Sequence, residues 1–231
     1  MRLPQDATWL WKFLYALATL LRPLFCRLRV EGHEHVPSTS GCVIACNHTM
    51  GPDYFILGYA APRQIYYMAK IELFQIHPWF SRFLELVGTF PIDRGRNDTA
   101  ALSAAEALLR RGQVLGMFPE GTRSRTGELR RGKSGVARLA MTTQTPVVPA
   151  VVINAEALLN QLGRRPEVIV RFGLPLSLVG DPNDKAAVQT QTDTVMRAIA
   201  QLLPPAQRGI YGGDNNEATT KAAPPFAEQA P

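Results

Sequence analysis

A histidine and an aspartate lie five positions apart in residues 47–53, whose sequence is NHTMGPD. On an unbroken helix this spacing would place His48 and Asp53 about 140° apart, because successive residues rotate by about 100°. Gly51 and Pro52 interrupt such a helix, so the Asp53 carboxylate can turn back toward a ring nitrogen of His48. A carboxylate in that position fixes the tautomer and stabilises the imidazolium, which predicts that His48 acts as a general base.

The residues on either side of this segment predict a strand and a helix. Residues 41–46 form a short apolar run bounded by turn residues, which is typical of a buried strand. Residues 54–60 favour a helix, and Pro52 suits its first turn. A strand that leads into a helix leaves the connecting side chains at the end of a sheet, where α/β proteins place their chemistry. The simpler alternative is that His48 caps the strand and Asp53 merely begins the helix.

Polar residues also stand at the ends of three later segments that the sequence predicts as strands. These segments cover residues 64–70, 86–94 and 114–118. The polar residues at or just beyond their ends are Lys70, Arg94, Glu120 and Arg123. Strand ends far apart in sequence can meet in space, so these side chains are candidates for a common site with His48. The alternatives are solvated strand ends at Lys70 and Arg94, and a local ion pair between Glu120 and Arg123.

The remaining chain alternates between predicted strands and helices. Further strands are expected at residues 27–32 (an edge strand), 146–153 and 167–173. Helices are expected at residues 71–86 with a break near His77 and Pro78, and at 98–111, 134–142 and 185–203. This order predicts one α/β domain over residues 27–203, with a mostly parallel or mixed central sheet flanked by helices. Residues 204–231 are rich in proline, glycine, alanine and polar residues and are expected to form a disordered tail.

The N-terminal segment, residues 1–26, is expected to associate with a membrane. Residues 9–26 are apolar on nearly every helical face, but Lys12 and Arg22 leave an uninterrupted apolar run of nine residues. A spanning helix needs about twenty apolar residues, so a helix lying in the membrane interface is favoured. No convincing cleavage site follows, which argues against a signal peptide. The alternative is a hydrophobic helix packed on the core.

Composition limits the classes of partner. The 231 residues carry a net charge of +6, and residues 151–231 hold 7 basic against 8 acidic side chains, so the basic excess lies with the candidate site. Such an excess favours phosphorylated substrates, anionic lipid or nucleic acid. No nucleic-acid recognition motif is visible, so no nucleic-acid partner is expected. Three cysteines are consistent with a reducing compartment, and no second ligand cluster follows Cys46 and His48, so no metal site is expected.

Residues 127–134 satisfy the phosphate-binding pattern G-x-x-x-x-G-K-[ST]. That loop should follow a strand directly, as well as opening a helix. Here the preceding residues 123–126 are polar, and the predicted strand ends at Phe118. We therefore interpret the pattern as a chance match and residues 123–133, with five cations and one acid, as a surface loop near an anionic ligand.

Four blocks stand in order along the chain. They are residues 47–53 with His-X4-Asp, 88–94 ending in arginine, 118–124 with the sequence FPEGTRS, and 147–149 with their flanks. With these blocks the chain closely resembles the glycerolipid acyltransferase family, specifically the 1-acylglycerol-3-phosphate O-acyltransferases. The resemblance covers about residues 9–180. The His-X4-Asp pattern alone is weak evidence, but four blocks in the family's order are strong.

The resemblance implies transfer of a fatty acyl group from acyl-CoA or acyl-carrier protein to lysophosphatidic acid, giving phosphatidic acid for phospholipid synthesis, with no cofactor beyond the thioester co-substrate. His48 would be the base, because an alcohol is too weak an acid to ionise near pH 7, and Asp53 would orient it. The chain is then expected at the cytoplasmic face of the cell membrane, as a peripheral or monotopic protein. A different lyso-lipid acceptor is the nearest alternative, and a non-catalytic lipid-binding module is a more distant one, since binding needs no base.

The resemblance also implies a substrate-binding set. The acceptor phosphate needs donors that stay charged, and Lys70, Arg94 and Arg123 supply them. Glu120 would repel a phosphate, so it is expected to hold an arginine or an acceptor hydroxyl. Gly121 would let the backbone approach the ligand closely. Thr122 completes the set.

Overall fold

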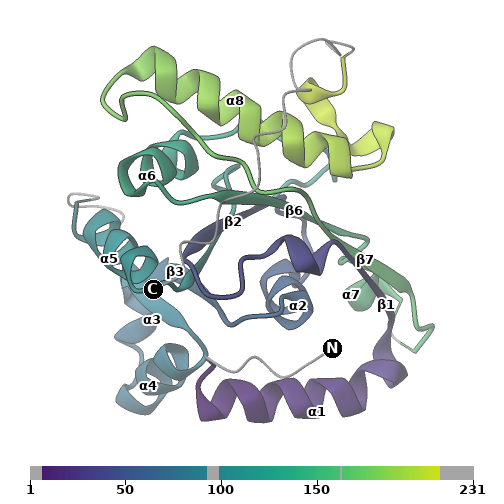
Figure 1. Cartoon of the computed structure of the whole chain (residues 1–231). Helices are drawn as coiled ribbons and strands as arrows, with labels where there is room; N and C mark the ends of the chain where they lie inside the picture. Colours follow the sequence, from purple (N-terminus) through teal and green to yellow (C-terminus); the bar gives the residue numbers. More distant parts are fainter. Residues whose placement is uncertain (1–6, 93–98, 162, 214–231) are drawn as a thin grey trace.

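The fold is a sheet covered by helices on both faces, seen in a computed structural model that describes residues 7–92, 99–161 and 163–213 (Figure 1). The seven strands are arranged in the order β1-β7-β6-β2-β5-β3-β4. Neighbouring strands run parallel except β6 and β7, which pair antiparallel. The predicted α/β class with a mostly parallel, mixed sheet is therefore confirmed. The strands are β1 (Arg27–Glu31), β2 (Cys42–Cys46), β3 (Ile65–Lys70), β4 (Thr89–Ile92), β5 (Val114–Met117), β6 (Val147–Ile153) and β7 (Glu167–Phe172).

Two hydrophobic clusters pack on opposite faces of the sheet. The central strand β2 alternates between them, with Val43 and Ala45 in one cluster and Cys42, Ile44 and Cys46 in the other. A strand buried on both faces has an unbroken apolar sequence, which is why residues 41–46 were recognisable. The first face is covered by α5 (Thr99–Arg110), α6 (Gly135–Thr143) and α8 (Lys185–Leu202). The second is covered by α2 (Asp53–Ala60) and the short α7 (Ala157–Asn160).

The helix expected at residues 71–86 is two helices, α3 (Ile71–Phe74) and α4 (Pro78–Leu86), so the predicted break is confirmed. The ring of His77 caps α4 by accepting the backbone N–H of Trp79 at 3.3 Å. The strand expected from residue 86 begins later, at Thr89. Leu86 still belongs to α4, and Gly88 has φ 86°, a turn conformation that glycine adopts without steric cost.

Helix α1 (Trp9–Phe25) lies along the face that α2 covers (Figure 1). Thr8 anchors its start: the hydroxyl accepts the N–H of Trp11, and the Thr8 N–H donates to Gln64 Oε1 at 2.9 Å. Tyr15 is buried and stacks on Tyr59, with ring centroids 4.9 Å apart. Within the described residues, we find no helix with the length and apolar character needed to cross a membrane.

The prediction of a disordered tail from Pro204 onward is wrong for residues 204–213. They form two short 3-10 helices, η2 (Pro205–Gln207) and η3 (Gly209–Tyr211). The Leu129 N–H donates to the Gln207 carbonyl at 2.8 Å, and the Gly132 N–H donates to the Tyr211 hydroxyl at 3.2 Å. Composition missed this contact because backbone groups and a single tyrosine make it. The rest of the expected tail, residues 214–231, lies outside the described part of the chain.

Candidate active site

His48 and Asp53 form the hydrogen bond that their spacing predicted. His48 Nδ1 donates to Asp53 Oδ2 at 2.9 Å, since an ionised carboxylate can only accept. Asp53 is fully buried, and its oxygens also accept the Thr49 N–H at 2.6 Å and the Thr49 hydroxyl at 2.7 Å. Asp53 is the first residue of α2, so Pro52 precedes the helix instead of standing in its first turn. A carboxylate at a helix N-terminus is stabilised by the helix dipole.

The loop between β2 and α2 is held against β6. The side chain of Asn47 bonds both backbone groups of Val152: its Nδ2 donates to the carbonyl at 3.0 Å, and its Oδ1 accepts the N–H at 2.8 Å. Gly51 lies directly against the backbone that follows β6, where a Cβ atom would stand 2.5 Å from the Ala155 carbonyl carbon. Only glycine fits this approach, so Gly51 does more than interrupt a helix.

Phe118 supports the histidine ring from the end of β5. The two rings stack with centroids 4.1 Å apart, and the His48 side chain is 16% exposed. Tyr67 of β3 stacks beside Phe118 at 6.2 Å, and Gly116 makes room for the Tyr67 ring, whose Cε1 would lie 2.4 Å from a Cβ there. With Nδ1 bound to Asp53 and one ring face covered, Nε2 is the nitrogen left to meet a ligand.

Glu120 joins the third sequence block to the first. It is buried, and its oxygens accept the backbone N–H of His48 at 2.7 Å and of Arg130 at 3.0 Å. The Ser124 N–H in turn donates to the His48 carbonyl at 2.8 Å. Burial raises the pKa of the Glu120 carboxyl above its ordinary value of 4.5, although the two N–H groups oppose that shift.

Glu120 was expected to hold an arginine or an acceptor hydroxyl. It does hold Arg130, through the backbone N–H of that residue, and the contact with an acceptor hydroxyl stays a prediction. Its partners are backbone groups, so Glu120 acts here as a positioning residue beneath the loop. Its motif neighbours Gly121, Thr122 and Arg123 line one cavity together with His48, and their substrate-binding role stays a prediction. Lys70 ends β3, paired with Ile92 of β4, but its side chain is not among those described, and Arg94 lies outside the described residues. Their predicted roles stay predictions.

The cavity beside His48 has a volume of about 1190 Å³, above the roughly 300–1,000 Å³ usual for small-molecule sites. Its polar lining includes His48, Thr122 and Arg123. Apolar side chains make most of the remaining wall, and they come chiefly from α1, α2 and α4. Examples from these helices are Trp11, Leu14, Ala18, Phe55, Phe80 and Phe83. An apolar cavity of this size next to a histidine suits a long-chain lipid group.

Sequence reasoning missed several residues that build this site. Asn47 and Thr49 flank the predicted histidine, but their partners became visible only in the fold. Lys133 is another: its Cδ, Cε and Nζ atoms lie 2.8–2.9 Å from where a Cβ of Gly121 would stand. Gly121 has φ 71°, a conformation that favours glycine. The sequence signals for Lys133 were its basic surroundings and its place in the G-x-x-x-x-G-K-[ST] pattern, which we interpreted as a chance match.

Cys46 is close to the site but does not suit a nucleophile. It is completely buried at the end of β2, and its thiol donates to Asn47 Oδ1 at 3.4 Å. Burial raises the pKa of this thiol well above its ordinary value, so it stays protonated and unreactive. Cys26, Cys42 and Cys46 are all free. Among the described residues, no group of three or more His, Cys, Asp or Glu side chains is placed to hold a metal ion.

The fold and the site define an α/β protein in which a histidine–aspartate pair lies beside a large, mainly apolar cavity whose described lining includes Arg123. Comparison with known proteins gives its family. The model of the family described as Acyltransferase matches residues 27–153, which is more than half of the chain. The chain belongs to the Acyltransferase family.

Individual relatives carry more specific names. A 1-acyl-sn-glycerol-3-phosphate acyltransferase of Bacillus subtilis (strain 168) is 40% identical over 124 residues, 53% of this chain and 61% of the relative. One of Saccharomyces cerevisiae is 32% identical over 166 residues, 68% of this chain and 54% of the relative. The match thus spans about half to three fifths of the length of these two relatives.

A solved structure shares the fold. The crystal structure of the 1-acyl-sn-glycerophosphate (LPA) acyltransferase PlsC from Thermotoga maritima superposes with a TM-score of 0.62 at 23% identity. The match covers 83% of this chain and 79% of that chain. At this identity the likeness establishes the architecture alone.

Proposed function

We propose that this protein transfers a fatty acyl group from an acyl thioester to the free hydroxyl of 1-acylglycerol-3-phosphate, giving phosphatidic acid. The observation that carries the proposal is the 2.9 Å bond from His48 Nδ1 to Asp53, made at the wall of an apolar cavity. The family membership and the names of the relatives support the reaction class. The apolar walls suit an acyl chain, and Arg123 suits the acceptor phosphate.

In the proposed reaction His48 Nε2 takes the proton of the acceptor hydroxyl as its oxygen attacks the thioester carbonyl. A new ester C–O bond forms, the C–S bond breaks, and the thiolate leaves with the proton returned from the imidazolium. Asp53 holds the imidazole in the Nδ1–H tautomer and stabilises its positive charge. The sequence has no Gly-X-Ser-X-Gly elbow, and the Cys46 thiol is buried and protonated, so direct transfer without a covalent enzyme intermediate is favoured.

Around the acceptor phosphate we assign Arg123 the main role, with Thr122 and the backbone at Gly121 beside it. Lys70 and Arg94 stay in the proposed set on sequence grounds. Lys133 joins them because its side chain crosses Gly121. Glu120 keeps the loop in place without touching the phosphate, which would avoid the repulsion that a direct contact brings. Another lyso-lipid acceptor remains the alternative within this class.

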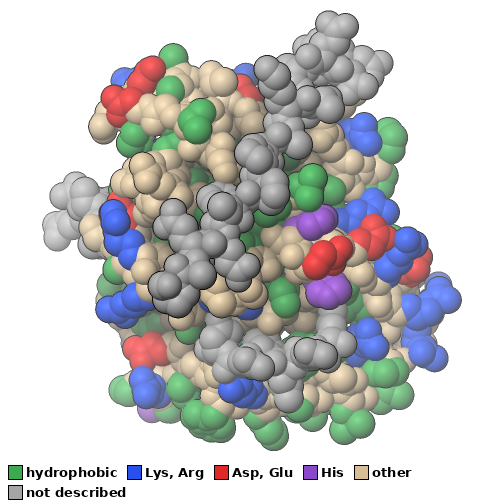
Figure 2. Space-filling model, in the orientation of Figure 1, with side chains coloured by type: hydrophobic (Ala, Val, Ile, Leu, Met, Phe, Trp, Pro, Cys, Tyr) green, Lys and Arg blue, Asp and Glu red, His purple; other side chains and the backbone are tan. Residues whose placement is uncertain are grey.

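We also propose that α1 seats the protein on a membrane at its cytoplasmic face. Apolar side chains gather along the edge of the molecule where α1 and α4 lie (Figure 2), and Trp9 and Leu20 of α1 are 69% and 74% exposed. Trp79 on α4 is also exposed, at 66%. The free cysteines fit a reducing compartment. A helix with an apolar outer face and basic residues suits the bilayer interface.

The test of the reaction is an acyl-transfer assay that pairs purified protein with a panel of lyso-lipids and both thioester donors. Wild-type protein should form phosphatidic acid from lysophosphatidic acid, and His48→Ala should abolish this while its circular dichroism and melting temperature stay unchanged. His33→Ala is the matched control, because His33 is exposed in the short η1 (His33–His35) and pairs with Glu34. Near-normal turnover of His48→Ala would remove the mechanism.

A further inference from the structure

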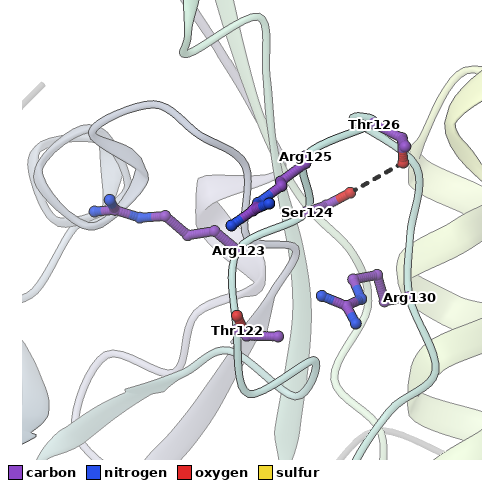
Figure 3. A pocket seen from close by; sticks show the side chains of 6 residues that line it. All are labelled: Thr122, Arg123, Ser124, Arg125, Thr126 and Arg130. Atoms are coloured by element: carbon purple, nitrogen blue, oxygen red, sulfur yellow. Dashed lines mark hydrogen bonds between the residues drawn. The ribbon is translucent and has the colours of Figure 1, made fainter.

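A second, smaller cavity is lined by residues of the FPEGTRS loop and of the segment that follows it (Figure 3). Its volume is about 410 Å³. Three of its six lining residues are arginines and the other three carry hydroxyl groups. The six are Thr122, Arg123, Ser124, Arg125, Thr126 and Arg130, and none of them is acidic. Guanidinium and hydroxyl donors together form the usual protein environment for a phosphate.

No ion pair within the described part of the chain neutralises the arginines of this cavity, although the charge of Arg130 does act on the Glu120 carboxyl. Arg125 and Arg130 are exposed, and within the described residues neither side chain forms an ion pair. Glu120 is the nearest acid in the hydrogen-bond network, but its oxygens are occupied by the N–H groups of His48 and Arg130. The Ser124 and Thr126 hydroxyls lie 3.4 Å apart. The cavity therefore offers donors to an external anion.

This smaller cavity is joined to the loop that carries His48 by a hydrogen bond, and it shares part of its lining with the larger cavity. Ser124 N–H bonds the His48 carbonyl, and Thr122 and Arg123 line both cavities. In Figure 3 the Arg123 side chain extends away from those of Arg125 and Arg130. The loop can thus bind one anion on the Arg123 side and another on the Arg125 and Arg130 side.

The proposed reaction brings two phosphate-bearing molecules to His48. The acceptor phosphate belongs with Arg123 in the larger cavity. The donor, whether acyl-CoA or acyl-carrier protein, presents its thioester on a 4′-phosphopantetheine arm that carries a phosphate. We propose that Arg125 and Arg130, with the hydroxyls of Ser124 and Thr126, bind the phosphate of this arm. The inference rests on the proposed function and adds a donor site to it.

The test compares donors with and without the phosphate. Steady-state kinetics are measured with acyl-CoA, acyl-carrier protein and the matching acyl-pantetheine, which lacks a phosphate, on wild type and on R125Q/R130Q. The control is R110Q/R111Q, two exposed arginines that precede β5 and so lie at the opposite end of the sheet. R125Q/R130Q should raise the KM of both phosphorylated donors about tenfold or more, as expected for loss of charge-assisted hydrogen bonds. The KM for lysophosphatidic acid and the kcat/KM for acyl-pantetheine should stay within about twofold.

Other results would overturn the proposal. An equal loss with acyl-pantetheine would mean a general structural effect, and a raised KM for lysophosphatidic acid alone would assign the site to the acceptor. An unchanged donor KM would leave the cavity without this role. Calorimetric measurement of CoA binding tests the phosphate site separately from the proposed acyl-transfer function. If wild type forms no phosphatidic acid yet binds CoA in a manner that depends on Arg125 and Arg130, the proposed function fails and the phosphate site stands. Absence of CoA binding as well would overturn both.

Discussion

Replacing Asp53 by asparagine tests the proposed mechanism without disturbing its geometry. The amide oxygen can take the place of Oδ2, which accepts from His48 Nδ1 and from the Thr49 N–H. The amide nitrogen then faces the Thr49 hydroxyl, which can accept a hydrogen bond. The fold should therefore survive with a loss of about 1–2 kcal/mol in the free energy of unfolding. What disappears is the negative charge beside the histidine.

The size of the catalytic effect follows from that charge. With Nδ1 and Oδ2 2.9 Å apart, the charge centres of an imidazolium and a carboxylate lie about 4 Å apart, which corresponds to roughly 4 kcal/mol at an effective dielectric constant of about 20. If the imidazolium is nearly complete in the transition state, kcat should fall about 10³-fold, because 1.36 kcal/mol is tenfold in rate. Labelled acyl transfer measures kcat, and thermal unfolding measures the fold.

A double variant shows whether Asp53 acts through His48. In a His48→Ala background, Asp53→Asn should cost almost nothing further in residual rate, because the group it stabilises is absent. A kcat for Asp53→Asn within tenfold of wild type would refute the reasoning. So would a second loss of several hundredfold in the double variant, since that would give Asp53 a role independent of the histidine.

Three further perturbations test the positions of the loop and of α1. Because burial raises the pKa of Glu120, the folded chain keeps the proton of this carboxyl to higher pH than the unfolded chain does. The stability that this proton contributes is therefore full below pH 4.5 and is lost as pH rises through the raised pKa. Glu120→Gln should flatten that part of the curve of melting temperature against pH, and an unchanged curve would contradict the assignment. Gly51→Ala should lower the free energy of unfolding by about 1–3 kcal/mol by pushing on Ala155, measured by urea denaturation, and a wild-type midpoint would show that the loop moves freely. L20Q/L24Q alters two exposed positions of α1 and should reduce flotation with anionic vesicles while leaving the melting temperature unchanged; undiminished flotation would place the membrane contact elsewhere.

Local patterns predicted the elements that present the site. The apolar run at β2, the Gly51–Pro52 interruption and the helical pattern after it were enough to anticipate the pairing of His48 and Asp53. This prediction succeeds because it depends on neighbours within a few positions, where periodicity and turn chemistry act directly. The places of Gly121, Thr122 and Arg123 beside His48 came instead from the family resemblance of the third block, because no local pattern relates residues so far apart in sequence.

The parts that failed depend on distant backbone groups. The Asn47 side chain finds its partner 105 positions away at Val152, and Glu120 bonds the N–H of His48, 72 positions earlier. A carboxylate that accepts backbone N–H groups has the same sequence appearance as one that pairs with an arginine. Likewise, Tyr211 carried no sign that its hydroxyl would accept the Gly132 N–H. Such contacts exist only once the sheet has brought the segments together.

The pairing of β1 with β7 sets an order on folding during synthesis. Arg27 pairs with Glu167, so β1 has no strand to pair with until β7 is translated, 140 residues later. At about 5–20 residues per second, that wait is roughly 7 to 28 s. During this interval the apolar helix in front of β1 lacks the strand pairing that ties its C-terminal end to the sheet. Once that helix has emerged from the ribosome, a bilayer or a chaperone can bind it before the domain is complete.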